Sequence, residues 1–241
     1  MKRRRTMQSL FPAVLAACAI SSSLAAPAAD PHQTDVGFFD IHVCNWPDQP
    51  LFLMALFSTR QFKDIARIDL VAPDGTRLGP LNLNRYRPGE DADKVEKRVL
   101  MTHYPIPEKG ADGWYRAHIV MKDGRTFEAR DHVVRKVLPF ARGHQPPDQS
   151  ENNPLPHELR WDPVPGARFY QVYVRDEWES ERYLLTSGVI SDNFLRLPAG
   201  LVKPGGSYTW RVHARDINGD PEWGDFNHGS LAKEVRFSVA E

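Results

Sequence analysis

Residues 201–216, LVKPGGSYTWRVHARD, decide the fold, because a Pro-Gly turn leads directly into a strand whose side chains alternate strictly. Successive side chains of a β-strand point to opposite faces of the sheet. The apolar face, which is predicted to be buried, carries Tyr208, Trp210, Val212 and Ala214. The polar face, which is predicted to point away from the core, carries Thr209, Arg211, His213 and Arg215. The stretch therefore predicts a sheet with one buried face and one solvated face.

The composition of the whole chain agrees with an all-β protein. Of its 241 residues, 41% are hydrophobic and 26% are charged, which is a globular composition with room for two domains. Its 20 prolines and 16 glycines stand between short apolar runs, and this favours many turns over long helices. We expect two tandem β-sandwich domains, at 35–138 and 155–241, joined by a stiff proline-rich linker at 139–154.

The N-terminus has the pattern of an export signal. Four basic residues, at positions 2–5, precede an apolar run over residues 10–20 and then a stretch of small residues. The apolar run is too short to span a bilayer, which takes about 20 residues. Residues 1–28 are therefore interpreted as a signal peptide.

Two cleavage routes are consistent with this signal. The sequence Leu-Ala-Ala-Cys that ends at Cys18 resembles the lipobox of bacterial lipoproteins, and it predicts a lipid on that cysteine. Ordinary cleavage after Ala25 or Ala28 is the alternative. The protein is expected to be exported, either periplasmic or secreted, or an outer-membrane lipoprotein under the first route. Either route leaves Cys44 without a disulfide partner, so both cores must be held by hydrophobic packing alone.

The charge of the mature chain excludes one class of partner. Removal of residues 1–28 takes away four basic residues and no acidic residue, which leaves 27 basic against 31 acidic residues and a net charge near −4. A negative chain without a basic surplus is unsuited to the phosphate backbone, so no nucleic-acid partner is expected.

The first domain, 35–138, is predicted to be an immunoglobulin-like sandwich of about seven short strands. The run LFLMALF at 51–57 is apolar at every position and predicts a strand that is buried on both faces. An Asp-Gly pair at 123–124 between two β-like runs predicts a hairpin. The charged segment 85–94 is expected to be a surface loop, and Trp114 is expected in the core.

The second domain carries motifs that resemble a fibronectin type III domain, and they occur in the right order over nearly its whole length. They include the segment LRWDPVPGA at 159–167, alternating apolar residues at 170–174, and the pattern L-x-x-P-G-x-x-Y at 201–208. The resemblance implies a core position for Trp161 and a hydrogen bond that ties the hydroxyl of Tyr208 back to its turn.

No segment carries a strong catalytic or metal-binding motif, so we expect a non-enzyme without cofactor or metal. Asp40, His42 and Cys44 are the residue types of a nucleophilic triad on one strand face. Alternate residues of a strand lie ~6.5 Å apart, whereas direct catalytic hydrogen bonds need ~2.6–3.2 Å, and this argues against catalysis. Residues 216–220, DINGD, resemble the start of a calcium loop but lack its later acidic ligand, which favours an ordinary turn.

The candidate binding residues lie on the polar face of the second domain and in the long loop 216–233. They are Tyr173, Arg175, Arg211, His213, Arg215 and, in the loop, Trp223. Tyrosine and arginine recur at interface hot spots, and a basic stripe suits an acidic protein or an anionic polysaccharide of the cell envelope. The alternative is that these side chains only cover a solvated sheet face, paired with nearby glutamates.

We therefore interpret the chain as an exported, non-catalytic binding or spacer protein of the bacterial cell envelope. The alternative is an accessory module or an enzyme that acts on an extracellular or cell-wall polysaccharide at a site between the domains. A deep pocket that joins both domains and carries Asp, Glu or His would favour this alternative. Two convex sandwiches without a shared cleft would favour binding.

The signal pattern predicts that the mature chain starts between Cys18 and Ala29. Intact-mass measurement on protein from the native envelope tests this prediction. A diacyl or triacyl mass on Cys18 establishes the lipoprotein route, and a start at Ala26 or Ala29 establishes ordinary cleavage. A mature protein that keeps Met1 contradicts both routes.

Overall fold

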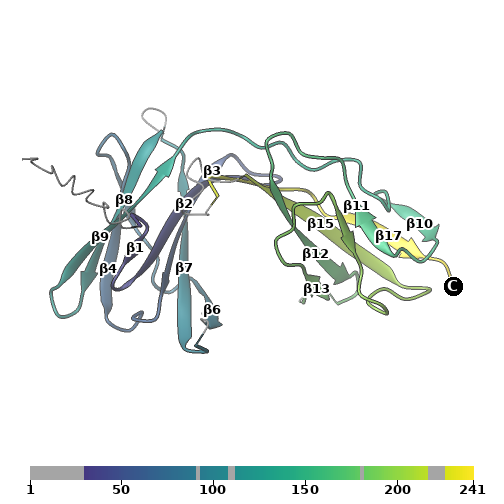
Figure 1. The fold of residues 1–241 in the computed structure, drawn as a ribbon, viewed down its shortest axis with the longest axis horizontal. Helices are drawn as coiled ribbons and strands as arrows, with labels where there is room; N and C mark the ends of the chain where they lie inside the picture. The colour runs from purple at the N-terminus through teal and green to yellow at the C-terminus, as the bar shows by residue number, and fades with distance from the viewer. Residues whose placement is uncertain (1–29, 91–92, 108–111, 180–181, 217–225) are drawn as a thin grey trace, which may run out of the picture.

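The protein is all-β, as the sequence predicted (Figure 1). The computed structural model describes residues 30–90, 93–107, 112–179, 182–216 and 226–241. Every regular element in these ranges is a strand. In the same ranges, we find no helix with the length and apolarity that a membrane crossing requires. The proposed signal peptide, with Cys18, lies outside the described residues.

The N-terminal half is a sandwich of two stacked sheets. Its strands are β1 (Gln33–Thr34), β2 (Gly37–Asn45), β3 (Phe52–Thr59), β4 (Ile65–Val71), β5 (Arg77–Pro80), β6 (Tyr86–Glu90), β7 (Glu96–Pro105), β8 (Gly113–Met121) and β9 (Thr126–Val133). One sheet has the order β5-β4-β8-β9, and the other contains β2-β3-β7-β6 with β1 at its side. Apolar side chains of both sheets, including Phe39, Phe57 and Ile119, form one buried core between them.

The C-terminal half has its own core. Its strands are β10 (Ser150–Asn153), β11 (Glu158–Arg160), β12 (Phe169–Asp176), β13 (Leu185–Thr186), β14 (Phe194–Arg196), β15 (Ser207–Arg215), β16 (His228–Leu231) and β17 (Val235–Val239). The two-stranded sheet β11-β14 packs on the sheet that contains β12, β15 and β17. Trp161 and Trp210 are 2% and 1% exposed in the core between them.

Two expectations for this half are confirmed. The predicted inward residues of β15 are buried, from Tyr208 to Ala214 on one face. The hydroxyl of Tyr208 accepts a hydrogen bond from the backbone N–H of Lys203 at 2.9 Å, which ties the strand to the preceding turn. Local alternation and turn chemistry were sufficient to predict both features.

The two halves share one sheet of 11 strands, which the sequence did not predict. Strand β16 pairs antiparallel with β15 and parallel with β2, so that His228 lies opposite Val43 and Gly229 opposite Cys44. The long loop expected at 216–233 therefore ends in a strand whose four residues, 228–231, are all buried. In Figure 1 the halves form an arch, with β6 and β13 near its two lower ends.

The chain segment that leads into the linker is hydrogen-bonded to this junction. The backbone N–H of Lys136 donates to Nε2 of His228 at 3.0 Å, and the hydroxyl of Ser230 donates to the carbonyl of Pro139 at 2.7 Å. His228 and Ser230 of β16 thus fix the position of the chain segment that leads from one half to the other. These bonds add to the backbone pairing of β16 at the junction.

Two expectations for the first half are wrong. The segment expected as a surface loop at 85–94 contains strand β6, which pairs with β7 at the edge of the sheet. Its exposed edge position explains the polar sequence and tolerates Pro88, which has no N–H to donate. Trp114 is 42% exposed, because the neighbouring Tyr115 of β8 takes the inward-facing position instead.

The apolar run at 51–57 is confirmed as a strand buried on both faces. Its odd-numbered residues Leu53, Ala55 and Phe57 lie in the sandwich core. Phe52 and Met54 point to the opposite face and form a separate apolar cluster with Cys44. The second buried face of β3 therefore lies outside the sandwich core.

Gly229 of β16 is tightly enclosed at the junction. A Cβ atom there would lie 2.5 Å from Nε2 of His213 and 3.2 Å from the ring of Phe226. We expect Gly229→Ala to lower the free energy of unfolding by ~1–3 kcal/mol, because overpacking forces side chains or backbone to shift. Urea unfolding measures the change.

Gly188→Ala is the matched control, because no atom lies within 4 Å of the Cβ position there. We expect a change within ~0.5 kcal/mol for this control. Equal effects of the two substitutions would contradict a tightly packed junction.

Candidate functional site

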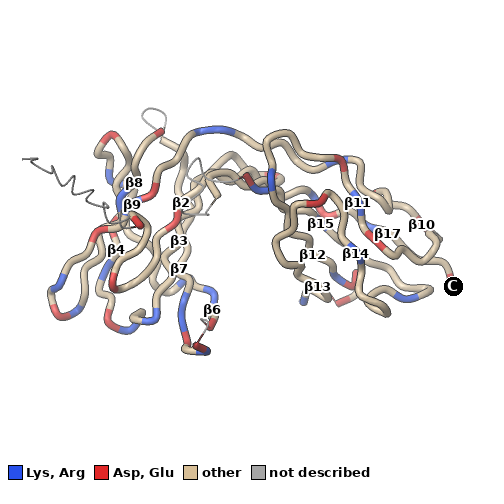
Figure 2. Tube along the Cα trace, in the orientation of Figure 1, with Lys and Arg blue, Asp and Glu red and all other residues tan. Residues whose placement is uncertain are grey.

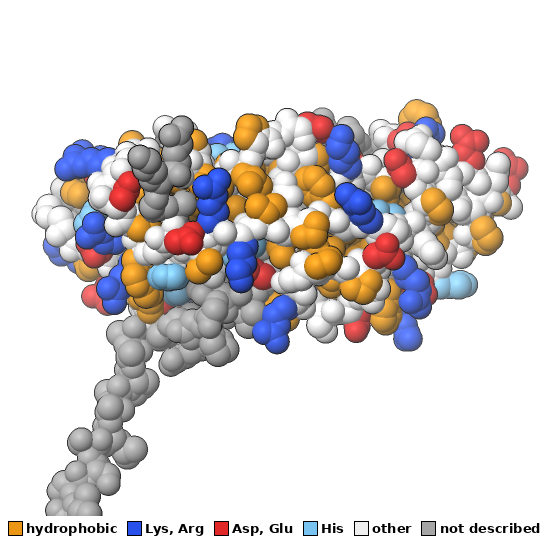
Figure 3. All heavy atoms as spheres, turned by 90° about the horizontal axis from the view of Figure 1, so that it is seen from above, with side chains coloured by type: hydrophobic (Ala, Val, Ile, Leu, Met, Phe, Trp, Pro, Cys, Tyr) orange, Lys and Arg blue, Asp and Glu red, His pale blue; other side chains and the backbone are white. Residues whose placement is uncertain are grey.

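A cleft of about 1140 Å³ lies on the concave side of the arch, between the two halves. Residues from both halves line it, from His42 and Arg87 on one side to Tyr173 and Arg215 on the other. Basic positions next to β6 are marked in Figure 2. The view from above the arch in Figure 3 shows basic, acidic and hydrophobic side chains interspersed over both halves.

The first wall is the outer face of the sheet β2-β3-β7-β6. The register places His42 beside Met54 and Met54 beside His103, so these three side chains form one row across the wall. A neighbouring row contains Leu56 and Met101. The wall is thus apolar in its middle, and Arg85 and Arg87 border it on the β6 side.

The second wall is the polar face of β12 and β15. The register places Tyr173 beside Arg211 and Gln171 beside His213. Side-chain hydrogen bonds hold this wall in place: Arg215 donates to Oε1 of Gln171 at 2.6 Å, and the hydroxyl of Tyr173 donates to the same oxygen at 2.8 Å. Arg211 donates to the hydroxyl of Tyr183 at 2.6 Å.

Four of the candidate binding residues from the sequence line this cleft. They are Tyr173, Arg211, His213 and Arg215. Arg175 continues the same face and stacks on Tyr183 at 4.0 Å from the ring centroid. Trp223 lies outside the described residues. The strand alternation placed these side chains on one face, but it gave no sign that the other half of the chain stands opposite.

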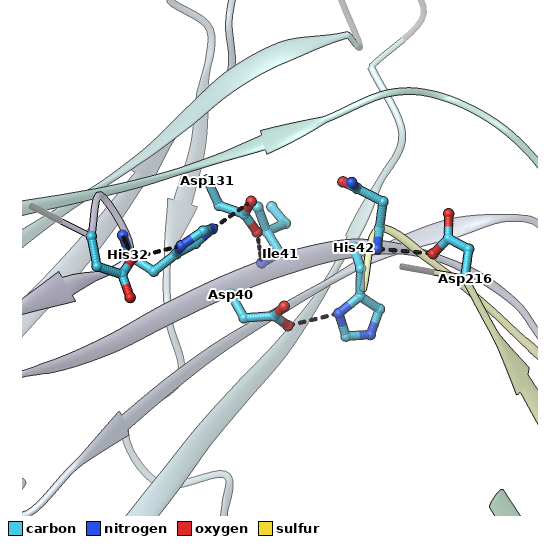
Figure 4. Close-up of polar contacts among 8 residues, drawn as sticks. His32, Asp40, Ile41, His42, Asp131 and Asp216 are labelled. Carbon is cyan, nitrogen blue, oxygen red and sulfur yellow. Dashed lines mark hydrogen bonds and ion pairs between the residues drawn. The ribbon is translucent and has the colours of Figure 1, made fainter. Parts of the chain in front are cut away.

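His42 and Asp40 form a buried pair in the first wall (Figure 4). Nδ1 of His42 lies 2.7 Å from Oδ2 of Asp40, so the expectation that spacing prevents direct contact is wrong for this pair. The two side chains lean toward each other along the same face of β2. Burial alone lowers the pKa of His42, but Asp40 and Cys44 raise it to about 10, so the ring is charged at neutral pH.

His213, opposite, is held neutral by its burial and by the cations around it. Burial lowers its pKa well below the usual 6.5, and four nearby cations lower it further. They are Arg215, His42, Arg211 and Arg87, in decreasing order of effect. Arg87 and His42 belong to the first half, so the positive charges of both halves act on one point. The pKa of His103 is lowered in the same way by burial and by Arg85.

The acidic residues of the cleft are already paired. Oδ1 of Asp48 lies 3.0 Å from Nζ of Lys233, and Oε1 of Glu234 lies 3.7 Å from both Arg175 and Arg211. Arg85, Arg87 and Arg215 have no carboxylate within ion-pair distance among the described residues. The cleft therefore carries a surplus of positive charge in a chain whose mature charge is expected to be negative.

Two buried polar pairs that the sequence did not reveal are structural. Nε2 of His32 lies 3.0 Å from Oδ1 of Asp131, whose other oxygen accepts the backbone N–H of Ile41 at 2.8 Å (Figure 4). This fastens the segment before β1 to β2 and β9. Asp216 accepts the backbone N–H of His228 at 2.7 Å and pairs with its ring.

The pairing of Asp216 bears on the calcium hypothesis, because one oxygen of the first residue of DINGD is engaged by the backbone. Residues 217–220 lie outside the described residues. Among the described ranges, no cluster of three or more His, Cys, Asp or Glu side chains is arranged to hold a metal ion.

No family model and no curated protein sequence matches this chain. Solved structures that resemble it include SGBP-B of the Bacteroides ovatus mixed-linkage glucan utilization locus, in complex with a mixed-linkage heptasaccharide. The identity to SGBP-B is 14% and the TM-score is 0.23, over 82% of this chain and 42% of that one. This chain therefore spans less than half of the length of SGBP-B.

Two further solved structures align with this chain over nearly their whole length. Murine CEACAM1b is 10% identical with a TM-score of 0.24, over 83% of this chain and 100% of that one. The two-domain structure DIP-gamma IG1+IG2 is 12% identical with a TM-score of 0.22, over 86% of this chain and 98% of that one.

The raised pKa of His42 predicts a pH-dependent stability. Folding favours the charged ring, so its contribution is complete below pH 6.5 and is lost as the pH rises through about 10. In His42→Gln, the fall of the free energy of unfolding between these pH values should become shallower than in the wild type. Urea unfolding at several pH values across this window measures it.

His103→Gln is the control, because a histidine whose pKa is lowered is neutral in both states above pH 6.5. This variant should keep the wild-type pH dependence. Parallel curves for His42→Gln and the wild type would contradict the charged pair with Asp40.

Proposed function

We propose that this protein is an exported, non-catalytic binding protein that holds an anionic macromolecule of the cell envelope in the cleft of the arch. The observation that carries the proposal is the convergence of cations from both halves on one cleft. Arg85 and Arg87 come from the first half, and Arg211 and Arg215 come from the second. Guanidinium groups bind carboxylates and other oxyanions in bidentate fashion, which suits them to this task.

The size of the cleft supports a macromolecular ligand. Its volume of about 1140 Å³ exceeds the ~300–1,000 Å³ that is usual for small-molecule sites. The cleft is also open along the concave side of the arch, so a ligand segment has room to extend beyond it.

A pocket between the halves was the feature expected to favour an enzyme or an accessory module for a polysaccharide. Two observations favour binding. Cys44 and His42 are only 1% and 3% exposed, which restricts access of a substrate to the sulfur. The acids of the cleft, Asp48 and Glu234, are engaged by cations and are not poised as a pair for acid–base chemistry.

The finer domain assignment is part of this proposal. We infer an immunoglobulin-like first half and a fibronectin type III-like second half, supported by the buried Trp161 and by the hydrogen bond from Lys203 to Tyr208. Export, with or without a lipid on Cys18, is supported by the signal pattern of residues 1–28.

Charge reversal at the exposed edge of the first wall tests the proposal. Arg85→Glu with Arg87→Glu should weaken binding to immobilised polygalacturonate or poly-glutamate by about tenfold or more, because each change removes a cation and adds a repelling acid. Both side chains are exposed, so the fold should be kept. Biosensor measurements at low and high salt give the affinities.

Arg77→Glu with Arg196→Glu is the matched control, because it changes the net charge equally at exposed sites outside the cleft. It should bind as the wild type does. Equal losses in both double variants would show that total charge and not the cleft decides. A wild-type protein that binds neither polyanion would contradict the proposal.

A further inference from the structure

The middle of the first wall is a hydrophobic cluster that has no place in the sandwich core. Its members are Cys44, Phe52 and Met54, with Trp46, Leu56 and Met101 packed against them. Met54, Leu56 and Met101 reach the cleft. Their thioether and aliphatic side chains offer no hydrogen-bond donor, so a hydroxyl group buried against them loses its hydration without a replacement. Methionine surfaces instead adapt to apolar side chains of varied shape.

Three aromatic rings of the cleft, those of Tyr173, Tyr183 and Phe226, offer little open surface for stacking on a sugar. Trp46, which also lines the cleft, makes edge contacts with the rings of Phe52 and His103. Tyr183 has Arg175 at 4.0 Å from its ring centroid, and the ring of Tyr173 lies 5.1 Å away. The ring of Phe226 lies 4.1 Å from that of His42 and has Arg215 at 4.9 Å. Cations and neighbouring rings thus already pack against these rings.

The second wall differs in chemistry from the first. Arg211 and Arg215 lie on one strand face with the amide of Gln171 and the hydroxyl of Tyr173, so this wall is rich in donors. A ligand in the cleft therefore meets two different walls. One has an apolar centre bordered by His42, His103, Arg85 and Arg87, and the other is cationic and rich in hydrogen-bond donors.

An extended polypeptide fits two such walls, because its successive side chains point in opposite directions. We propose that the cleft binds an extended acidic polypeptide segment in which acidic and apolar side chains alternate. The apolar side chains contact Leu56 and Met101 over the buried Met54, and the carboxylates face Arg211 and Arg215. This inference rests on the proposed function and names the class of its macromolecule.

Fluorescence anisotropy with synthetic ligands tests the inference on the full chain. The probe is a labelled peptide of about ten residues in which glutamate alternates with valine, a length that spans ~33 Å when extended. The comparison ligands are a peptide of the same composition with its glutamates and valines in two blocks, oligo-glutamate, and oligogalacturonate. We expect the alternating peptide to bind about tenfold more tightly than each of them.

A variant of the apolar wall separates its contribution from that of the charges. Leu56→Ser with Met101→Ser should lower the affinity for the alternating peptide by about tenfold, because the valines of this peptide contact the apolar wall. The affinity for oligo-glutamate, which has no apolar side chains, should be unchanged. Val137→Ser with Val189→Ser is the control, since these valines are 50% and 54% exposed and lie outside the cleft. Thermal melting shows whether each variant is folded.

The outcomes separate the polypeptide inference from the proposal of an anionic ligand. Tighter binding of oligogalacturonate, or equal binding of the alternating and block peptides, overturns the polypeptide inference and leaves the anionic-ligand proposal in place. Failure of every ligand to bind overturns both. If the wall variant does not fold, the comparison of the alternating and block peptides on the wild type still decides.

Discussion

The parallel pairing of β16 with β2 is the constraint on which the rest of the structure depends. Through it, strand β15 of one half and strand β2 of the other belong to one sheet. The junction is buried, since Ser230 and Ala214 have no exposed surface, and backbone groups are paired on both edges of β16. Two sandwiches with separate cores thereby acquire a defined arrangement.

This arrangement explains why the polar sheet faces became cleft walls. Strand β16 joins β15 and β2 in one continuous sheet, and the outer faces of β2 and β15 both line the same cleft. Alternation alone required His42 and His213 to point away from their own cores. The junction then brings both rings into one charged environment, in which the charge of His42 lowers the pKa of His213.

Local patterns predicted those parts of the fold that depend on neighbours in sequence. The alternation of β15, the doubly buried β3 and the tie of Tyr208 to its turn all follow from short stretches. Strand β16 has the sequence HGSL, which lacks β-branched and aromatic residues, and its parallel partner is far away in the chain. The cleft depends on this pairing, so its second wall was predicted as a surface without an opposing partner. The contact of Asp40 with His42 was missed because backbone spacing ignores the lean of side chains.

The cations that line the cleft also repel one another across it. This repulsion disfavours the observed arrangement of the two halves, which the backbone pairing of β16 with β15 and β2 maintains. Counter-ions weaken such repulsion within a Debye length, which is about 8 Å at physiological ionic strength. Dissolved salt or a bound polyanion therefore relieves the same repulsion, which couples the stability of the junction to ionic strength and to ligand binding.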